Sequence, residues 1–259
     1  MIMKEIKLKQ LFFTFTLLFI TTLLEAQPTK KDYIRTAFEL GLFLSIEYDL
    51  INMSSIQNKN FDEPNTVDTY FRDKMLWSNK NIDKAKTYSD ILLYGIVLGS
   101  IPTTPLLSKK DDYKSMVLAN IEVLAINGLV TDITKYLVGR QRPYSYFKTY
   151  EQEKDTFKSF FSGHTSSAFA IATSSAMMLS DEYQNKKTLI WGSTYALASA
   201  TGYFRIAADK HYLSDVIVGA IVGSSIGYLT QKSIAKSYLS VNIGPTKTLT
   251  RNFQLSWDF

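Results

Sequence analysis

The sequence of 259 residues lacks cysteine altogether and contains only two histidines, His164 and His211. Without cysteine, neither a disulfide framework nor a thiolate metal site can form, and two histidines are too few for a histidine-rich metal centre. The formal net charge is only +5, and no dense run of lysine and arginine occurs. The sequence therefore predicts no metal, no other cofactor and no nucleic-acid partner.

The N-terminus has the pattern of a secretory signal peptide. The basic opening MIMKEIKLKQ precedes the apolar run LFFTFTLLFITTLL at 11–24, and Ala26 is a small residue suited to cleavage. We expect a signal peptide over residues 1–26. An uncleaved membrane anchor is the alternative, although the run is short for a membrane span. Both interpretations export the rest of the chain, to the periplasm or to the cell envelope membrane, with any functional site facing the periplasm.

Apolar segments dominate the chain after residue 90. Their content of Ala, Gly, Ser and Leu favours helices over strands, and they lie at 91–107, 116–131, 167–180, 188–204 and 216–230. A membrane span needs about 20 apolar residues, whereas these runs are at or below that length and the mean hydropathy of the chain is −0.05. A soluble helical bundle and a membrane bundle both fit this pattern.

The other segments differ in composition from this core. A helical pattern at about 30–50 and a polar stretch at 52–86 indicate an N-terminal lead-in of helices and loops. We therefore expect a signal peptide, a lead-in over 27–89, a catalytic core over 90–234 and a tail over 235–259.

The end of the core and the tail carry two further patterns. Gly219, Gly223 and Gly227 repeat every four residues, which predicts that a neighbouring helix packs closely against the last core helix. In the tail, LSVNI (239–243) and FQLSWDF (253–259) alternate between apolar and polar residues around a Gly-Pro pair. This alternation predicts a short C-terminal β-hairpin.

Three cations in short, well-spaced clusters suit a tetrahedral oxyanion. Lys135 and Arg142 lie seven residues apart, two turns of a continuing helix, and Arg205 follows much later. An arginine offers a planar fork of donors that matches phosphate oxygens, and a lysine offers a compact charge. Gly163 lets its backbone N–H approach an anion closely because no side chain intervenes, and Ser162 beside it adds a hydroxyl.

The two histidines lie beside these cations in the sequence. His211 follows Arg205 by six residues, and Asp215 follows His211 by four, so the aspartate can hydrogen-bond the histidine in a helical turn. A histidine held by a carboxylate keeps one tautomer and leaves its other nitrogen basic. His164, directly after Ser162 and Gly163, can supply a proton. Together these residues form a nucleophile, an acid and an anion cradle that require no metal.

These clusters resemble the type 2 phosphatidic acid phosphatase superfamily. Its signature is Lys-x6-Arg-Pro, then Pro-Ser-Gly-His, then Ser-Arg-x5-His-x3-Asp, and the chain matches all three motifs in order over roughly residues 90–232. Two positions depart from the pattern: Phe161 replaces the proline and Phe204 replaces the serine. A proline presets the turn that presents Ser162, so these departures bear on rate or substrate.

The resemblance implies an all-α fold, a bundle of about six core helices, and a phosphatase that forms a phosphohistidine. It implies that His211 attacks phosphorus, that Asp215 orients His211, and that His164 protonates the leaving oxygen. The residues that would hold the phosphate oxygens are Lys135, Arg142, Ser162, Gly163 and Arg205. The expected substrate is a phosphate monoester or diphosphate of a lipid, such as a polyprenyl diphosphate, a phosphatidate-type lipid or lipid A.

Other functions fit the same residues. A vanadium-dependent haloperoxidase shares this anion site, a soluble periplasmic phosphatase of broad specificity would use it on small phosphate esters, and a helical envelope protein could retain it as a relict. The aromatic connector at 144–161 fits a lid, a belt at the membrane interface, or simple packing on the bundle.

Overall fold

The computed structural model describes residues 30–51, 53, 59–108, 113–151 and 153–241. Within these ranges the chain is helical, as the sequence predicts, with a single isolated β-bridge between Asn60 and Arg140. Six long helices form the body of the protein: α2 (Lys30–Glu47), α4 (Ile82–Leu107), α5 (Tyr113–Val138), α7 (Gly163–Glu182), α8 (Lys187–Ala207) and α9 (Leu213–Val241). Three short ones complete it: α3 (Thr66–Met75), α6 (Pro143–Tyr146) and the 3₁₀ turn η2 (Gln184–Lys186).

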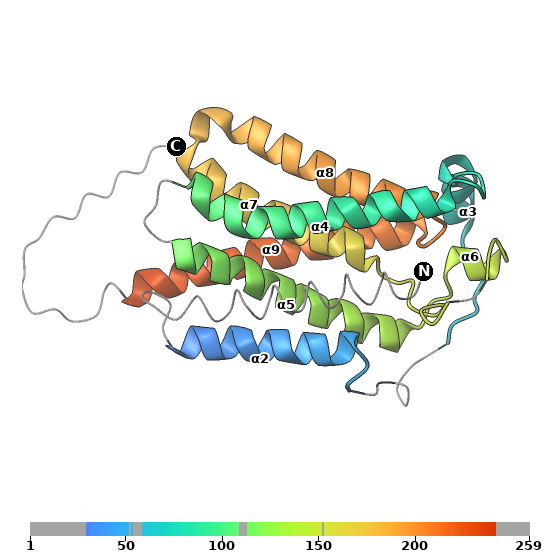
Figure 1. The fold of residues 1–259 in the computed structure, drawn as a ribbon, viewed down its shortest axis with the longest axis horizontal. Helices are drawn as coiled ribbons and strands as arrows, with labels where there is room; N and C mark the ends of the chain where they lie inside the picture. Colours follow the sequence, from blue (N-terminus) through green and yellow to red (C-terminus); the bar gives the residue numbers. More distant parts are fainter. Residues whose placement is uncertain (1–29, 52, 54–58, 109–112, 152, 242–259) are drawn as a thin grey trace, which may run out of the picture.

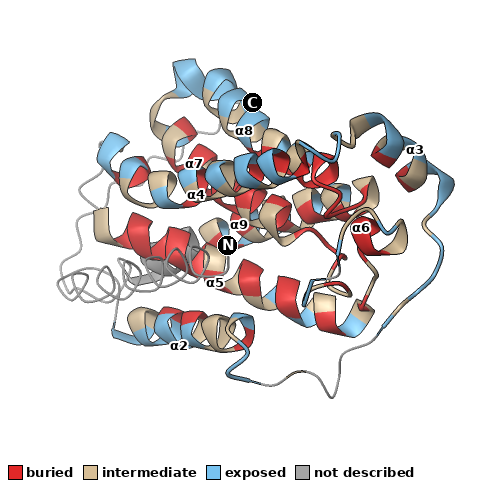
Figure 2. Cartoon of the chain, turned by 45° about the vertical axis from the view of Figure 1, so that its right-hand side comes forward, coloured by how far each residue is buried: buried red, intermediate tan, exposed pale blue. Residues whose placement is uncertain are grey.

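The long helices run roughly side by side, and α3 and α6 gather at one end of the bundle (Figure 1). Helix α7 lies in the middle and packs against α4, α5, α8 and α9. Helix α2 lies on the outside and packs along α5. Buried residues concentrate on α5 and α7, whereas α4 and α8 turn exposed faces outward (Figure 2). The loops that carry the three sequence motifs therefore emerge at the end where α3 and α6 lie.

Close packing of α7 on α9 depends on the predicted glycine face. A Cβ atom added to Gly223 would lie 2.1 Å from the carbonyl oxygen of Ser166, and one on Gly227 would lie 2.4 Å from that of Ala170. A Cβ on Gly219 would lie 2.8 Å from the carbonyl oxygen of Ser162. The missing side chains let the two backbones approach, which places the N-terminus of α7 beside that of α9.

Among the described residues, three helices are long and apolar enough to cross a membrane: Ile82–Leu107, Tyr113–Val138 and Leu213–Ser233. The most apolar 18-residue stretch of α5 is 72% buried inside the protein, whereas the corresponding stretches of α4 and α9 are only 17% and 28% buried. Large apolar side chains on these two helices, such as Ile91 and Ile221, are 61% exposed. The sequence leaves open a soluble bundle and a membrane bundle. Apolar side chains exposed on the outside of the protein favour the membrane bundle.

The structure confirms the predicted helical segments and corrects one end. Helix α9 continues to Val241, so residues 239–241 are helical and do not begin the predicted strand at 239–243. The remainder of the predicted hairpin and the predicted signal peptide lie outside the described residues. Helix α4 also runs through the boundary expected between residues 89 and 90, joining the lead-in to the core.

Candidate active site

The ends of α5, α7 and α8 bring the three motifs together around one cavity of 310 Å³. Six of the eight predicted site residues line it: Lys135, Arg142, Gly163, His164, Arg205 and His211. The other two lie just outside the lining: Ser162 directly precedes Gly163, and Asp215 Oδ2 is 3.7 Å from His211 Nδ1. A set that spans 81 positions of sequence, from 135 to 215, is therefore one spatial cluster.

His211 is buried, and its hydrogen bonds determine which ring nitrogen carries the proton and which carries the free lone pair. Its Nδ1 lies 2.8 Å from the backbone carbonyl oxygen of Ser159, and a carbonyl can only accept, so Nδ1 carries the proton. The lone pair is then on Nε2, which lies 3.2 Å from Nη1 of Arg142. Burial, followed by the charges of Arg142 and Arg205, lowers the pKa of His211 well below its ordinary value. Its imidazole is therefore neutral near pH 7, as a nucleophile requires.

Asp215 reaches His211 through an intermediate residue. His211 precedes the start of α9 at Leu213, and Asp215 Oδ2 is 3.7 Å from His211 Nδ1. That oxygen instead accepts hydrogen bonds from the hydroxyl of Ser159 at 2.6 Å and from the N–H of Tyr212 at 2.9 Å. Asp215 thus holds Ser159, whose carbonyl holds His211. The hydrogen bond from the N–H of Tyr212, just before α9, to the Asp215 carboxylate resembles that of a capping box, in which an acidic side chain accepts from the backbone N–H three residues earlier.

Two arginines line the cavity and differ in how fully their N–H groups are hydrogen-bonded. Arg142 is paired, with Nη2 2.8 Å from Asp155 Oδ2 and Nη1 donating to the carbonyl of Lys210 at 3.1 Å. Arg205 donates from Nη1 to the hydroxyl of Ser89 at 3.1 Å, but its buried Nε has no hydrogen-bond partner among the described residues. A buried guanidinium N–H without a partner is costly, and an anion in the cavity would satisfy it.

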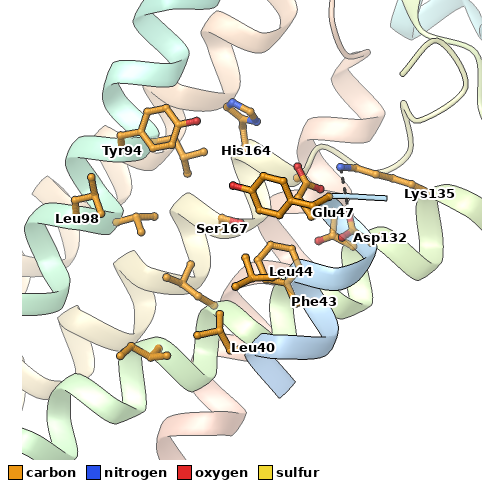
Figure 3. A pocket seen from close by; sticks show the side chains of 18 of the residues that line it. Leu40, Phe43, Leu44, Glu47, Tyr94, Leu98, Asp132, Lys135, His164 and Ser167 are labelled. Atoms are coloured by element: carbon orange, nitrogen blue, oxygen red, sulfur yellow. Dashed lines mark ion pairs between the residues drawn. The ribbon is translucent and has the colours of Figure 1, made fainter. Parts of the chain in front are cut away.

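Lys135 and Gly163 lie against each other at the polar end of the cavity. Lys135 Nζ is 3.0 Å from the place where a Cβ on Gly163 would be, so the missing side chain makes room for the ammonium group. Asp132, one turn earlier on α5, is 3.9 Å from Nζ, a loose ion pair that leaves the lysine available to a stronger anion. Figure 3 shows the ion pair of Lys135 and Asp132 as a dashed line, below and to the right of His164 in this view.

Ser162 caps α7. Its Oγ accepts from the N–H of Thr165 at 3.4 Å and from the hydroxyl of Thr165 at 2.9 Å, and its own N–H donates to the carbonyl of Asp215 at 3.1 Å. Serine is a preferred N-cap because its oxygen satisfies an N–H of the first turn. The cap sets the orientation of Gly163 and His164, the first two residues of α7.

His164 pairs with an acidic residue that the sequence motifs do not contain. Its Nε2 lies 2.8 Å from Oδ1 of Asp90 on α4, and the same oxygen is 3.6 Å from Nη1 of Arg205. The side chain of His164 remains 29% exposed to the cavity. Burial, with the charge of Arg205, lowers its pKa to about 4, although the hydrogen bond to Asp90 opposes this shift.

Sequence reasoning missed three residues of the site: Asp90, Asp155 and Ser159. Asp90 is the last charged residue before a long apolar run, a signal that could have drawn attention to it, because a charge inside an apolar helix needs a partner. Asp155 and Ser159 lie in the aromatic connector, where no pattern separates them from other polar loop residues.

Aromatic residues of the connector pack within the protein. Tyr144 stacks on Tyr150 with ring centroids 4.4 Å apart, and Phe157 meets Phe61 edge-on at 4.7 Å. Phe161, in place of the family proline, is 2% exposed. This packing supports the simplest of the three interpretations of the connector and holds Asp155 against Arg142.

The second departure from the family pattern also has a packing role. Phe204, in place of serine, meets Trp77 and Tyr88 edge-on at 5.6 and 5.5 Å. Trp77 is tied to α8 by hydrogen bonds from its indole N–H to the hydroxyl of Tyr203 and from its backbone N–H to Ala207. The aromatic side chain therefore joins the segment after α3 to the C-terminal end of α8, close to Arg205.

The cavity continues from these polar groups into an apolar groove. Leu40, Phe43 and Leu44 of α2 face Leu98 of α4 across it, below His164 and Lys135 (Figure 3). Further apolar lining comes from Leu93, Val97, Ile101, Ile121 and Leu124. One cavity thus has an end suited to an anion and an end suited to a hydrocarbon.

The chain is similar to known proteins over the region that carries the three motifs. A model of the PAP2 superfamily matches residues 117–238, which contain all eight predicted site residues. The lipid A 1-phosphatase of Porphyromonas gingivalis is 31% identical over 121 residues, which are 47% of this chain and 24% of that protein, so the match spans about a quarter of the relative's length. The crystal structure of Aquifex aeolicus LpxE has a TM-score of 0.44 and 26% identity, covering 58% of this chain and 85% of that one. The match to the PAP2, or type 2 phosphatidic acid phosphatase, superfamily over residues 117–238 confirms the resemblance that the three motifs predict for the helical core.

Proposed function

We propose that the protein is a membrane-associated, metal-independent phosphatase that hydrolyses the phosphate of a lipid through a phosphohistidine intermediate. One observation carries the proposal: the cavity joins three cations and two histidines directly to an apolar groove between α2, α4 and α5. A phosphate ester with a long hydrocarbon chain fits both ends at once, whereas a small soluble ester uses only the polar end.

The length of the groove supports a lipid. Its lining on α5 runs from Lys135 to Ile121, which is about 21 Å at 1.5 Å per residue. One leaflet of a bilayer has a hydrocarbon depth of about 15 Å, half of the full core. A chain that enters the groove can therefore stay at the depth of its own leaflet while its phosphate reaches His211.

The contacts suggest how the reaction proceeds. Nε2 of His211 attacks phosphorus; an N–P bond forms as the bridging P–O bond breaks, and the electron pair leaves with the oxygen, which takes a proton from His164. Water then attacks phosphorus and returns a proton to His164, while the electron pair of the N–P bond returns to Nε2. The products are an alcohol and inorganic phosphate, and the donors of Lys135, Arg142 and Arg205 balance the charge of the equatorial oxygens throughout.

Among lipid phosphates, lipid A is favoured by the similarity to a lipid A 1-phosphatase. Polyprenyl diphosphates and phosphatidate-type lipids present the same combination of phosphate and hydrocarbon. The basic and apolar pattern of residues 1–26 supports export, with the site on the periplasmic side of the inner membrane.

Phosphate release from a panel of substrates tests the proposal. The full chain, purified in detergent micelles, is assayed with lipid A, phosphatidate, a polyprenyl diphosphate and a soluble nitrophenyl phosphate. We expect the highest kcat/KM with one of the lipids, and we expect His211→Ala to lower it by about 10⁴-fold or more, because the nucleophile is lost.

Labelling provides a control on the mechanism. Substrate carrying ³²P should leave acid-labile label on the wild-type protein and none on a folded His211→Ala variant. Equal kcat/KM for lipids and the soluble ester would contradict a lipid substrate. Near-normal turnover by His211→Ala would contradict the phosphohistidine.

A further inference from the structure

Asp90 is the one carboxylate that contacts His164 among the described residues, and no motif contains it. It lies on α4, outside residues 117–238 that match the family model. Its neighbour Ser89 accepts a hydrogen bond from Arg205. Two adjacent residues of α4 thus contact His164 and Arg205, although both of these lie more than 70 positions later in the sequence.

The contact between Asp90 and His164 has the geometry of a charge-assisted hydrogen bond. Oδ1 of Asp90 lies 2.8 Å from Nε2 of His164, and both side chains are partly exposed, to 35% and 29%. An ionised carboxylate only accepts, so Nε2 carries a proton in this contact. The aspartate thereby sets the tautomer of the neutral ring and restrains its orientation.

The surroundings of His164 make a carboxylate necessary. The charged or titratable groups that face it are Asp90 from α4, Lys135 from α5, Arg205 from α8 and His211 from the loop before α9. Burial and the two cations disfavour the imidazolium that a proton donor requires, and Asp90 is the opposing influence. A bound phosphate would add negative charge to the same cavity and act in the same direction as Asp90.

We propose that Asp90 is a positioning residue of the phosphatase reaction: together with the bound phosphate it favours the protonated form of His164, and it orients the ring to give a proton to the leaving oxygen. This inference rests on the function proposed above. Asp90 itself keeps its charge: the proton moves from His164 to the oxygen as the P–O bond breaks, and water later restores it to His164. The aspartate therefore matters most when the leaving alcohol needs a proton most.

Dependence on the leaving group tests the proposal. The full chain and Asp90→Asn are compared in micelles with a nitrophenyl phosphate, whose leaving group is acidic, and with a long-chain alkyl phosphate, whose leaving group is basic. We expect kcat for the alkyl phosphate to fall about 10- to 100-fold, part of the roughly 10²–10⁴ that proton transfer provides. We expect kcat for the nitrophenyl ester to fall several-fold less.

The pH profile gives a second readout. His164 must be protonated to act as an acid, so activity is lost as pH rises through its pKa in the substrate complex. Without the carboxylate of Asp90 this pKa falls, and the alkaline limb of kcat for the alkyl phosphate should move to lower pH in Asp90→Asn. Asp90→Glu, which restores the carboxylate, should move the limb back toward that of the wild type.

Two comparisons separate this role from a loss of fold or of charge. Asp155→Asn removes a different carboxylate, which lines the cavity and pairs with Arg142, and should lower kcat by the same factor for both substrates. In a His164→Ala background, Asp90→Asn should have no further effect on kcat. The proposal would be overturned if Asp90→Asn lowered kcat equally for both substrates, or if it lowered kcat by its full factor in the His164→Ala background. If the wild type released no phosphate, the proposed function itself would be refuted.

Discussion

Residues 113–241 and residues 30–108 contribute to the site in different ways. The first region, α5 to α9, contains every residue of the three motifs and thus the proposed nucleophile, the proposed acid and the three cations of the cavity. The second region, α2 to α4, supplies Asp90, Ser89 and one wall of the groove. The candidate phosphate-binding residues are therefore grouped along the sequence. The partners of His164 and Arg205 on α4, and the α2 wall of the groove, come from elements far away in it.

The two regions are joined by buried ion pairs at the end of the bundle that holds the site. Arg140, inside the first motif, places Nη2 2.8 Å from Asp68 of α3 and Nη1 2.6 Å from Asp215 of α9. Asp68 also accepts from the N–H and hydroxyl of Ser214 in the first turn of α9. Because Asp215 in turn holds Ser159, and Ser159 holds His211, helix α3 supports the nucleophile through this chain of contacts.

Removing the central member of this chain should give the largest effect. Arg140→Ala leaves Asp68 and Asp215, which are 1% and 0% exposed, without their cation. We expect a loss of about 3–5 kcal/mol in the free energy of unfolding, because breaking a buried pair leaves uncompensated charge. Thermal unfolding in detergent measures the stability, and phosphate release should fall with it.

The control is a cation in an exposed pair. Lys86 reaches Glu153 at 3.4 Å, with side chains 27% and 38% exposed, so Lys86→Ala should change stability by only about 0–1 kcal/mol. Equal stability of Arg140→Ala and Lys86→Ala would show that α3 does not support the motif region.

An intermediate effect is expected within the motif region itself. Gly223→Ala places a methyl group against the backbone of Ser166, which cannot move aside without shifting α7. We expect a cost of about 1–3 kcal/mol from overpacking, together with reduced activity because the N-terminus of α7 carries His164. Gly192→Ala on α8 is the matched control, since nothing lies within 4 Å of its added Cβ. A Gly223→Ala variant as stable as Gly192→Ala would contradict the packing of α7 on α9.

The smallest effect should separate substrates and leave stability largely intact. A Cβ on Gly128 of α5 would lie 2.4 Å from the ring of Phe43 on α2, and a ring at the end of a side chain can move. Gly128→Ala should push this ring in the groove and raise KM for a long-chain phosphate about tenfold, within the range for one methylene in an apolar pocket. KM for nitrophenyl phosphate should stay unchanged.

Two variants check this explanation. Gly95→Ala on α4, where nothing lies within 4 Å of the added Cβ, should leave both KM values unchanged. Phe43→Ala combined with Gly128→Ala should lower KM for the long-chain phosphate again. A rise in KM for both substrates in Gly128→Ala would indicate a general distortion and remove α2 from the groove.

Local patterns in the sequence were sufficient for the helices. Runs such as 91–107 and 188–204 stay apolar over several turns and are rich in Leu, Ala, Gly and Ser, so their length and composition favour helices over strands, even though Pro102 and Pro105 lie inside the first. The prediction was wrong for 239–241, where five alternating residues suggested a strand at the end of a long helix. Extending an existing helix adds one hydrogen bond per residue without a new nucleus, which outweighs so short an alternation.

By itself, the sequence determined the chemistry of the polar end: which residue types are present, in which order, and on which helix ends. Their spacing along the chain carries that information because each motif is one helix end or one turn. Only the tertiary structure decided that Asp90 reaches His164 across 74 positions, that Ser159 stands between Asp215 and His211, and that α2 closes an apolar groove. These contacts depend on how helices pack on one another, and packing brings together residues whose separation in sequence has no period to detect.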